Sequence, residues 1–543
     1  MPSPKNAGLP HPTDKISTSR ASWRRLAGPF GGCLLLVLTI AIGCRPQGSS
    51  SPPSRPTGTN TAGSNNDVLN YAIDVLRGME DTGKSDTLDS VVARLNQWVK
   101  AQPGLPDWKP DPLVGTLPAD VKKLPNLQTL VELEFAPIDG TDLRQIIWLR
   151  EVSEHSAGTE NDPLIRATKL FDWTVRNIQL TAPGSTPVPH VPADILLFGR
   201  GQANDRAWVF MLLARQQGLD VVMLARPGSD PAKVGELLPA LLSDGKLYLF
   251  DPTLGMPIPG PGGKGVATLD EVAKDDSLLR RLDLDAEHPY PLKASDFQQV
   301  VALVEASPLY LSQRARLVEA ALAGKQQLAL SVQPSKLAER LKTVANVQSV
   351  GLWPIPYERF LKRIVPDGKM VQAAFDELRP FQIGMPPFPP DAGTLMRARV
   401  LHLLGNYTGT EGAIAMYQHS RPSQRQLQEI LDDKRVQPQQ RPQLQAVVDV
   451  LNTTKEDASY WLGLVAFERG DYETAIDYFK KRTLDASPKG PWTAGARYNL
   501  GRTYEAQGKK AEAAGQFEAG QSPQRHGNLL RARWLKEPSE KKP

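Results

Sequence analysis

A buried helix followed by two apolar strands constrains the fold of this chain more than any other stretch. The helix covers residues 203–217: its small and apolar residues recur at helical spacing, and Gly218 supplies a left-handed stop. Asn204 or Asp205 can cap its N-terminus. Residues 219–225 and 246–250 have the composition of strands, and the second strand ends in Asp251. The pattern predicts an α+β core.

This order of elements resembles the transglutaminase-like fold. The resemblance includes an amphipathic helix at residues 167–178 and the motif Asp251-Pro252-Thr253 after the second strand. In active members of that family, a Cys at the helix N-terminus works with a His and an Asp. The resemblance places Ala203 at the Cys position and Asp251 at the Asp position, and no His lies between His190 and His288. It therefore implies the fold and argues against the family's chemistry.

The N-terminus has the pattern of an export signal. Five Lys and Arg residues precede an apolar run at residues 33–42, and Gly43-Cys44 follows. The end of this run resembles a bacterial lipobox, which implies cleavage before Cys44 and a lipid on its thiol. An uncleaved anchor and an ordinary secretory signal remain alternatives. We expect a signal peptide at residues 1–43, a Ser/Pro/Gly-rich tether at residues 44–66, and a protein anchored to a membrane of the bacterial envelope.

Cysteine and histidine usage limits the chemistry. The chain has 2 Cys, Cys33 in the apolar run and Cys44, so the folded part can hold no disulfide, Cys-ligated zinc or Cys nucleophile. The His residues are dispersed, so we predict no metal site and no cofactor. The formal net charge of +5 comes largely from the first 43 residues, so we predict no nucleic-acid binding.

Two similar segments near the C-terminus indicate helical repeats. They share the spacing Leu-Gly, then Ala and then Phe, and they resemble tetratricopeptide repeats, whose small residues let paired helices approach closely. The period is 38 residues, from Gly463 to Gly501. A weaker copy spans residues 400–417, and helices at residues 424–451 are expected to complete the stack. The predicted repeat core comprises Leu462, Gly463, Ala475, Phe479, Leu500, Gly501, Ala513 and Phe517.

The sequence therefore predicts several domains: an α+β transglutaminase-like core, then a small α/β segment and an all-α tetratricopeptide-like array. The expected ranges are 67–155 for an N-terminal helical region, 156–266 for the core, 267–390 for the α/β segment, 391–522 for the repeats and 523–543 for a solvated basic tail. Within the α/β segment we expect helices at 297–306, 314–322 and 336–344 and strands at 326–332 and 347–353.

The function favoured by these patterns is a non-catalytic scaffold that binds protein or peptide partners through the repeats. One alternative is an envelope peptidase or amidase with an unusual active site, for which Ser185, Thr186 and Asp251 are available without a recognisable triad spacing. His190 precedes the site helix, so its chain order does not fit a catalytic base. A second alternative is an envelope-assembly lipoprotein that recognises cell-wall material through the groove of the core.

Overall fold

The computed structural model describes residues 64–537 except 80–84, 106, 183–190, 229–234, 435 and most of 365–392. The described residues all belong to one compact unit. The predicted signal peptide, Cys44 and most of the tether therefore lie outside the described residues, as do Ser185, Thr186 and His190. Within the described part of the chain, no helix combines the length and the apolar character needed to cross a membrane.

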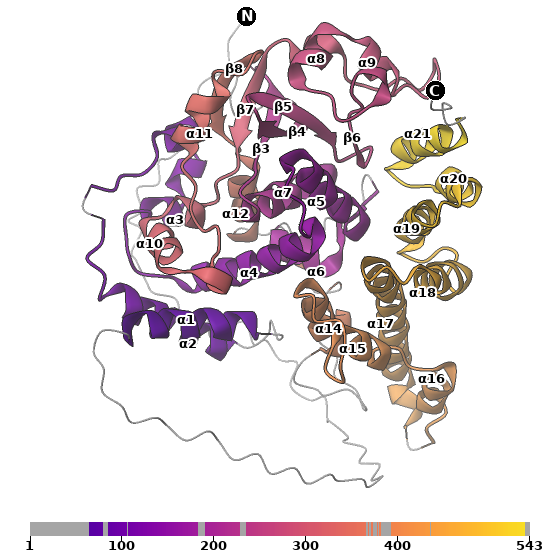
Figure 1. Cartoon of the computed structure of the whole chain (residues 1–543). Coiled ribbons are helices and arrows are strands. Elements are labelled where there is room, and N and C mark those ends of the chain that lie inside the picture. The colour runs from indigo at the N-terminus through magenta and orange to yellow at the C-terminus, as the bar shows by residue number, and fades with distance from the viewer. Residues whose placement is uncertain are drawn as a thin grey trace, which may run out of the picture. The chain divides into compact units, whose positions relative to one another are not determined.

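Helices dominate the first part of the unit (Figure 1). The amphipathic helices α1 (Ser64–Arg77) and α2 (Ser85–Val99) pack together, as their apolar faces predict, and both contact α4. The helix expected at residues 167–178 is α5, which begins where Asp162 accepts the backbone N–H groups of Leu164 and Ile165. The principal helices here are α4 (Pro137–Ala157), α5 (Pro163–Asn177), α6 (Pro192–Phe198) and α7 (Ala203–Gln216).

A mixed sheet packs against α5 and α7. Its strand order is β6-β5-β4-β3-β7-β8, antiparallel throughout except for the parallel pair β7 and β8. Strand β3 is buried on both faces, because Val221 and Met223 belong to one hydrophobic cluster and Val222 and Leu224 belong to another. The strands are β3 (Asp220–Arg226), β4 (Gly235–Ser243), β5 (Lys246–Asp251), β6 (Met256–Pro257), β7 (Val300–Val304) and β8 (Val347–Leu352).

Two expectations for residues 267–390 are wrong. The expected helix at 297–306 is strand β7, because a short apolar run has no periodicity that separates a buried strand from a helix. The expected strand at 326–332 has no strand pairing. Strands β7 and β8 extend the sheet that contains β3, so this region contributes to the central sheet. The remaining helices here are α8 (Leu269–Lys274), α9 (Ser277–Arg280), α10 (Gln313–Ala321), α11 (Pro334–Leu341) and α12 (Ile355–Ile364).

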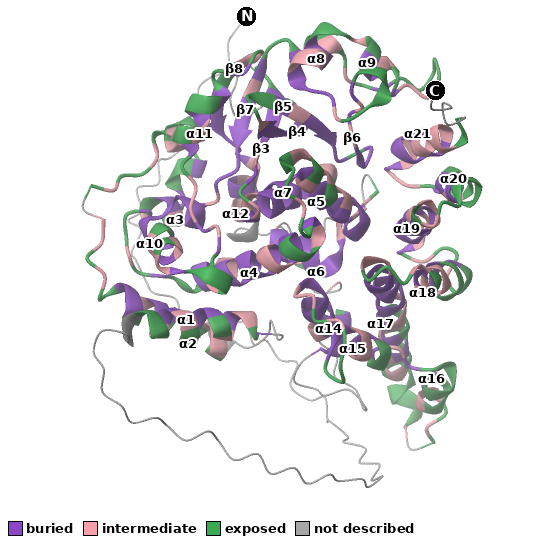
Figure 2. Cartoon of the chain, viewed as in Figure 1, coloured by how far each residue is buried: buried purple, intermediate pink, exposed green. Residues whose placement is uncertain are grey.

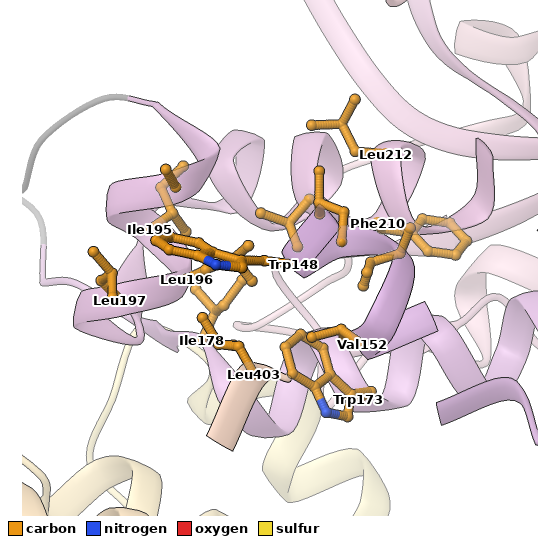
Figure 3. Close-up of a cluster of buried hydrophobic side chains, with 14 of the residues drawn as sticks. Trp148, Val152, Trp173, Ile178, Ile195, Leu196, Leu197, Phe210, Leu212 and Leu403 are labelled. Carbon is orange, nitrogen blue, oxygen red and sulfur yellow. The ribbon is translucent and has the colours of Figure 1, made fainter. Parts of the chain in front are cut away.

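The core beneath the sheet is built from helices that are distant in sequence. Phe171 of α5, Phe210 of α7 and Phe250 of β5 form an aromatic cluster with ring centroids 5.1–5.2 Å apart. Figure 3 shows Leu403 of α14 among side chains of α4, α5 and α6. The helical array and the α+β core therefore share one hydrophobic core.

Paired helices follow to the C-terminus. The helix α16 has Leu427 as its buried residue and is largely exposed in Figure 2. The predicted solvated tail is wrong for residues 525–536, which form α21, because Leu530 and Ala532 are buried in its packing on α20 and the core. The array comprises α14 (Thr394–Leu403), α15 (Ala413–His419), α16 (Gln424–Leu431), α17 (Arg441–Glu468), α18 (Tyr472–Ile476), the π-helix η9 (Asp477–Asp485), α19 (Thr493–Ala506), α20 (Lys510–Ala519) and α21 (Arg525–Lys536).

Candidate functional site

The N-terminus of α7 is where the structure places Ala203. Ala203 is the first residue of the helix, where the sequence predicted the helix to begin, and its side chain is half-buried. The expected cap is corrected: Gln202 is the N-cap residue, and the carboxylate of Asp205 accepts the Gln202 backbone N–H at 2.8 Å. An alanine methyl group occupies this position, so the helix N-terminus presents no nucleophile there.

Asp251 ends β5 and is buried. One carboxylate oxygen accepts the backbone N–H groups of Thr253 and Leu254 at 2.7 and 2.9 Å, and the other accepts the Tyr290 hydroxyl at 2.7 Å. Burial raises the pKa of Asp251, and the hydrogen bond from Tyr290 opposes this rise. Asp251 therefore stabilises the turn that follows β5. Tyr290 was not predicted because it is 39 residues away in sequence.

Glu236 of β4 lies beside the start of α7, which sequence reasoning missed. Its carboxylate accepts hydrogen bonds from the side-chain amide of Asn204 and from the indole N–H of Trp353. Burial raises the pKa of Glu236, and these two donors oppose the rise. The carboxylate is therefore held by side chains of α7 and of the residue that follows β8.

The strand that carries Glu236 was missed because Pro239 argues against a central strand. The structure accommodates Pro239 at an irregularity, where the pairing of β3 with β4 shifts register between Met223 and Ala225. Ala225 pairs with Glu236 on the far side of that shift.

Arg206 connects the start of α7 to the turn after Asp251. It is 1% exposed, and its guanidinium donates to the carbonyl of Ile178 at 2.7 Å, to that of Pro252 at 2.9 Å and to the side chain of Gln524 at 2.7 Å. Burial lowers the pKa of Arg206 to about 10, so the side chain remains charged at neutral pH. The region around Ala203 and Asp251 is thus fixed by a buried cation that also holds the C-terminal end of the array.

The predicted repeat residues form two equivalent helix contacts. A Cβ atom at Gly463 would lie 2.5 Å from the ring of Phe479, and one at Gly501 would lie 2.7 Å from the ring of Phe517. Ala475 and Ala513 are fully buried, as are Phe479 and Phe517. The small residues therefore permit the close approach of paired helices that the sequence predicted.

Enlarging the small residues of the hairpins should destabilise the array. Ala475→Leu or Ala513→Leu is expected to lower the free energy of unfolding by about 1–3 kcal/mol, because each adds a branched side chain to a filled contact. Urea unfolding measures the change. Gly515→Ala on α20 is the matched control: its added Cβ would meet no atom within 4 Å, so it should be neutral or stabilising. Unchanged stability of both leucine variants would contradict this packing.

The first helices of the two hairpins, α17 and α19, face α5 of the core, and α18 and α20 lie on the other side of the array (Figure 1). Asn499 donates to the carbonyl of Arg176 at 3.0 Å, and Gln179 accepts the backbone N–H of Gly495 at 2.6 Å. Arg502 pairs with Asp172. The inner side, which helical repeats commonly offer to partners, is here occupied by α5 of the same chain.

A buried polar network around Glu468 extends this contact. The Glu468 carboxylate accepts hydrogen bonds from Asn177 of α5 at 3.0 Å, from Tyr407 at 2.9 Å and from His402 Nε2 at 3.0 Å. The Arg399 guanidinium can only donate, so Nδ1 of His402 accepts and Nε2 carries the hydrogen donated to Glu468. Burial lowers the pKa of His402. Burial alone would raise the pKa of Glu468, but His402 first, and then His155 and Arg176, hold it below its ordinary value.

Comparisons with known proteins support the helical repeats of this description. Cadherin-20 of Mus musculus and cadherin-20 of Rattus norvegicus are each 28% identical to this chain over 131 residues, which is 23% of this chain. The match spans 15% of the length of each cadherin. No solved structure matches the chain. The family model for the tetratricopeptide repeat matches residues 456–520, which span the hairpins formed by α17 to α20.

Proposed function

We propose that this chain is a non-catalytic interaction scaffold, tethered to a bacterial envelope membrane through a lipid on Cys44. The observation that carries the proposal is the pair of tetratricopeptide hairpins. Their inner helices pack on α5, and α18, η9 and α20 have exposed residues on the other side. Such repeats commonly bind proteins. Because α5 occupies the inner side, we expect partners to bind the outer helices.

The α+β core is, in this proposal, a transglutaminase-like domain without its chemistry. Supporting it are the order α5, α7, β3, β4 and β5, Ala203 at the first residue of α7, and Asp251 at the end of β5. The carboxylate beside the helix N-terminus, Glu236, is held by Asn204 and Trp353. A methyl group cannot attack an acyl carbon, so the position at the helix N-terminus holds no nucleophile.

Cross-linking in cells tests the scaffold. Exposed lysines of the repeats, Lys480, Lys481, Lys489, Lys509 and Lys510, should yield more cross-links to other proteins than the exposed core lysines Lys246, Lys264, Lys274 and Lys293. The core lysines are the internal control for reactivity. Cross-links confined to the core would contradict the proposal. The Cys44→Ser variant in the same membrane fractions should lose metabolic lipid labelling, and retained labelling would contradict the anchor.

Restoring a thiol tests the absence of catalysis. Ala203→Cys should react with iodoacetamide in the native protein, because the residue is half-buried at a helix N-terminus that favours thiolate. It should show almost no amide turnover, since acid–base catalysis contributes about 10²- to 10⁴-fold. Ala207→Cys, fully buried in the same helix, is the control and should not react. Efficient hydrolysis or cross-linking by Ala203→Cys would overturn the non-catalytic proposal.

A further inference from the structure

Three segments of the array bring cationic side chains together near Tyr478 of η9. Arg421 follows α15, Lys455 belongs to α17, and Arg482 belongs to η9. The guanidinium carbons of Arg421 and Arg482 lie 5.3 and 5.8 Å from the centre of the Tyr478 ring. We call these four residues the Tyr478 cluster.

The cluster is held in place by contacts that leave its charge largely uncompensated. Arg421 donates to the hydroxyl of Ser459 at 2.8 Å, one helical turn after Lys455. Asp477 pairs with Arg482 at 2.9 Å and also with Lys481 at 3.1 Å, so one carboxylate serves two cations. Asp477 also acts on Arg421, so a single carboxylate is set against Arg421, Lys481 and Arg482.

The pKa shifts of Arg421 and Lys455 agree with their placement beside other cations. Burial and the nearby charge of Arg482 lower the pKa of Arg421, and Tyr478 and Asp477 oppose this shift. Burial and the charge of Arg421 lower the pKa of Lys455. Arg421 and Lys455 are thus destabilised by a neighbouring cation, whereas Asp477 raises the pKa of Arg482. An anion added beside Arg421 and Lys455 would relieve their repulsion.

We propose that the Tyr478 cluster is a docking site for the carboxylates of an acidic segment in a partner protein, an inference that rests on the proposed scaffold function. A guanidinium pairs with a carboxylate through two parallel hydrogen bonds, and Tyr478 supplies an apolar surface for the side chain that carries it. Arg421, Lys455 and Tyr478 are half-buried, so they suit a protruding side chain better than a flat membrane surface.

The π-helical conformation of η9 gives this site its form. The segment runs from Asp477 to Asp485 as a π-helix, a rare conformation that is frequent at functional sites. The Thr483 hydroxyl donates to the carbonyl of Tyr478 at 2.9 Å, five residues earlier. The second hairpin has a regular α-helix, α20, at the corresponding place, so the site belongs to the first hairpin.

Fluorescence anisotropy with a labelled hexaglutamate peptide tests the proposal on the full chain. At low ionic strength the wild type should bind hexaglutamate and not hexaglutamine. Lys455→Gln or Arg482→Gln should weaken binding about twofold to fivefold, and the double variant about tenfold. Lys489→Gln, which removes an exposed lysine of the same hairpin, is the control and should bind as the wild type does.

Two results would overturn the site. One is equal binding of hexaglutamate and hexaglutamine, or equal hexaglutamate binding by all variants. The other is cluster-dependent binding to phosphatidylglycerol vesicles without hexaglutamate binding, which would identify a membrane contact. Circular dichroism verifies that the variants fold. The test uses Lys455 and Arg482, which are half-buried and exposed, and leaves Arg421 in place. The cross-linking test of the scaffold does not depend on this site, so a negative result with hexaglutamate would contradict the site and not the scaffold function.

Discussion

Replacing Glu468 with alanine should lower the free energy of unfolding by about 3–5 kcal/mol, the cost of breaking a buried charged network by removing one partner. The substitution leaves the donors of Asn177, Tyr407 and His402 without their shared acceptor. It also removes one of the polar contacts that join α17 to α5. Urea unfolding of the purified chain measures the loss.

An exposed glutamate in the same hairpin provides the comparison. The Glu473 side chain is 79% exposed and lies 4.0 Å from the ammonium group of Lys509. Glu473→Ala should change stability by no more than about 1 kcal/mol, because an exposed pair contributes little. If Glu468→Ala were no more destabilising than Glu473→Ala, the network would not hold the array on the core.

Arg206→Met should be comparably destabilising, by about 3–5 kcal/mol. Methionine fills much of the volume but donates no hydrogen bond, so the buried carbonyls of Ile178 and Pro252 and the side chain of Gln524 lose a charged donor. The substitution removes hydrogen bonds from the start of α7 to the turn after β5 and to the end of the array. The midpoint of urea unfolding should fall accordingly.

Arg425→Met separates the loss of a buried cation from the loss of any arginine. Arg425 of α16 has a side chain that is 88% exposed and pairs with Glu429 within the same helix. Its replacement should change stability by about 0.5 kcal/mol or less. Similar unfolding midpoints for the two variants would contradict the role assigned to Arg206.

Local patterns in the sequence determined the elements whose signals lie within one or two turns of chain. Helix α7 follows from its periodicity and Gly218, which has a φ of +67°. The hairpin contacts follow from the repeated spacing of small residues and phenylalanines, because both copies bring Gly and Phe together in the same way. The ending of β5 at Asp251 follows from the Asp-Pro turn.

Tertiary structure alone decided which distant residues meet. Glu236 reaches α7 because a register shift accommodates Pro239 in a strand, and Tyr290 reaches Asp251 across 39 residues of chain. The basic segment at 525–536 becomes α21 because its buried face finds α20 and the core, a contact that no local pattern encodes. The same limit applies to the repeats. Their sequence specifies two helix hairpins, but hydrogen bonds from another part of the chain place α5 on their inner side and leave the Tyr478 cluster half-exposed.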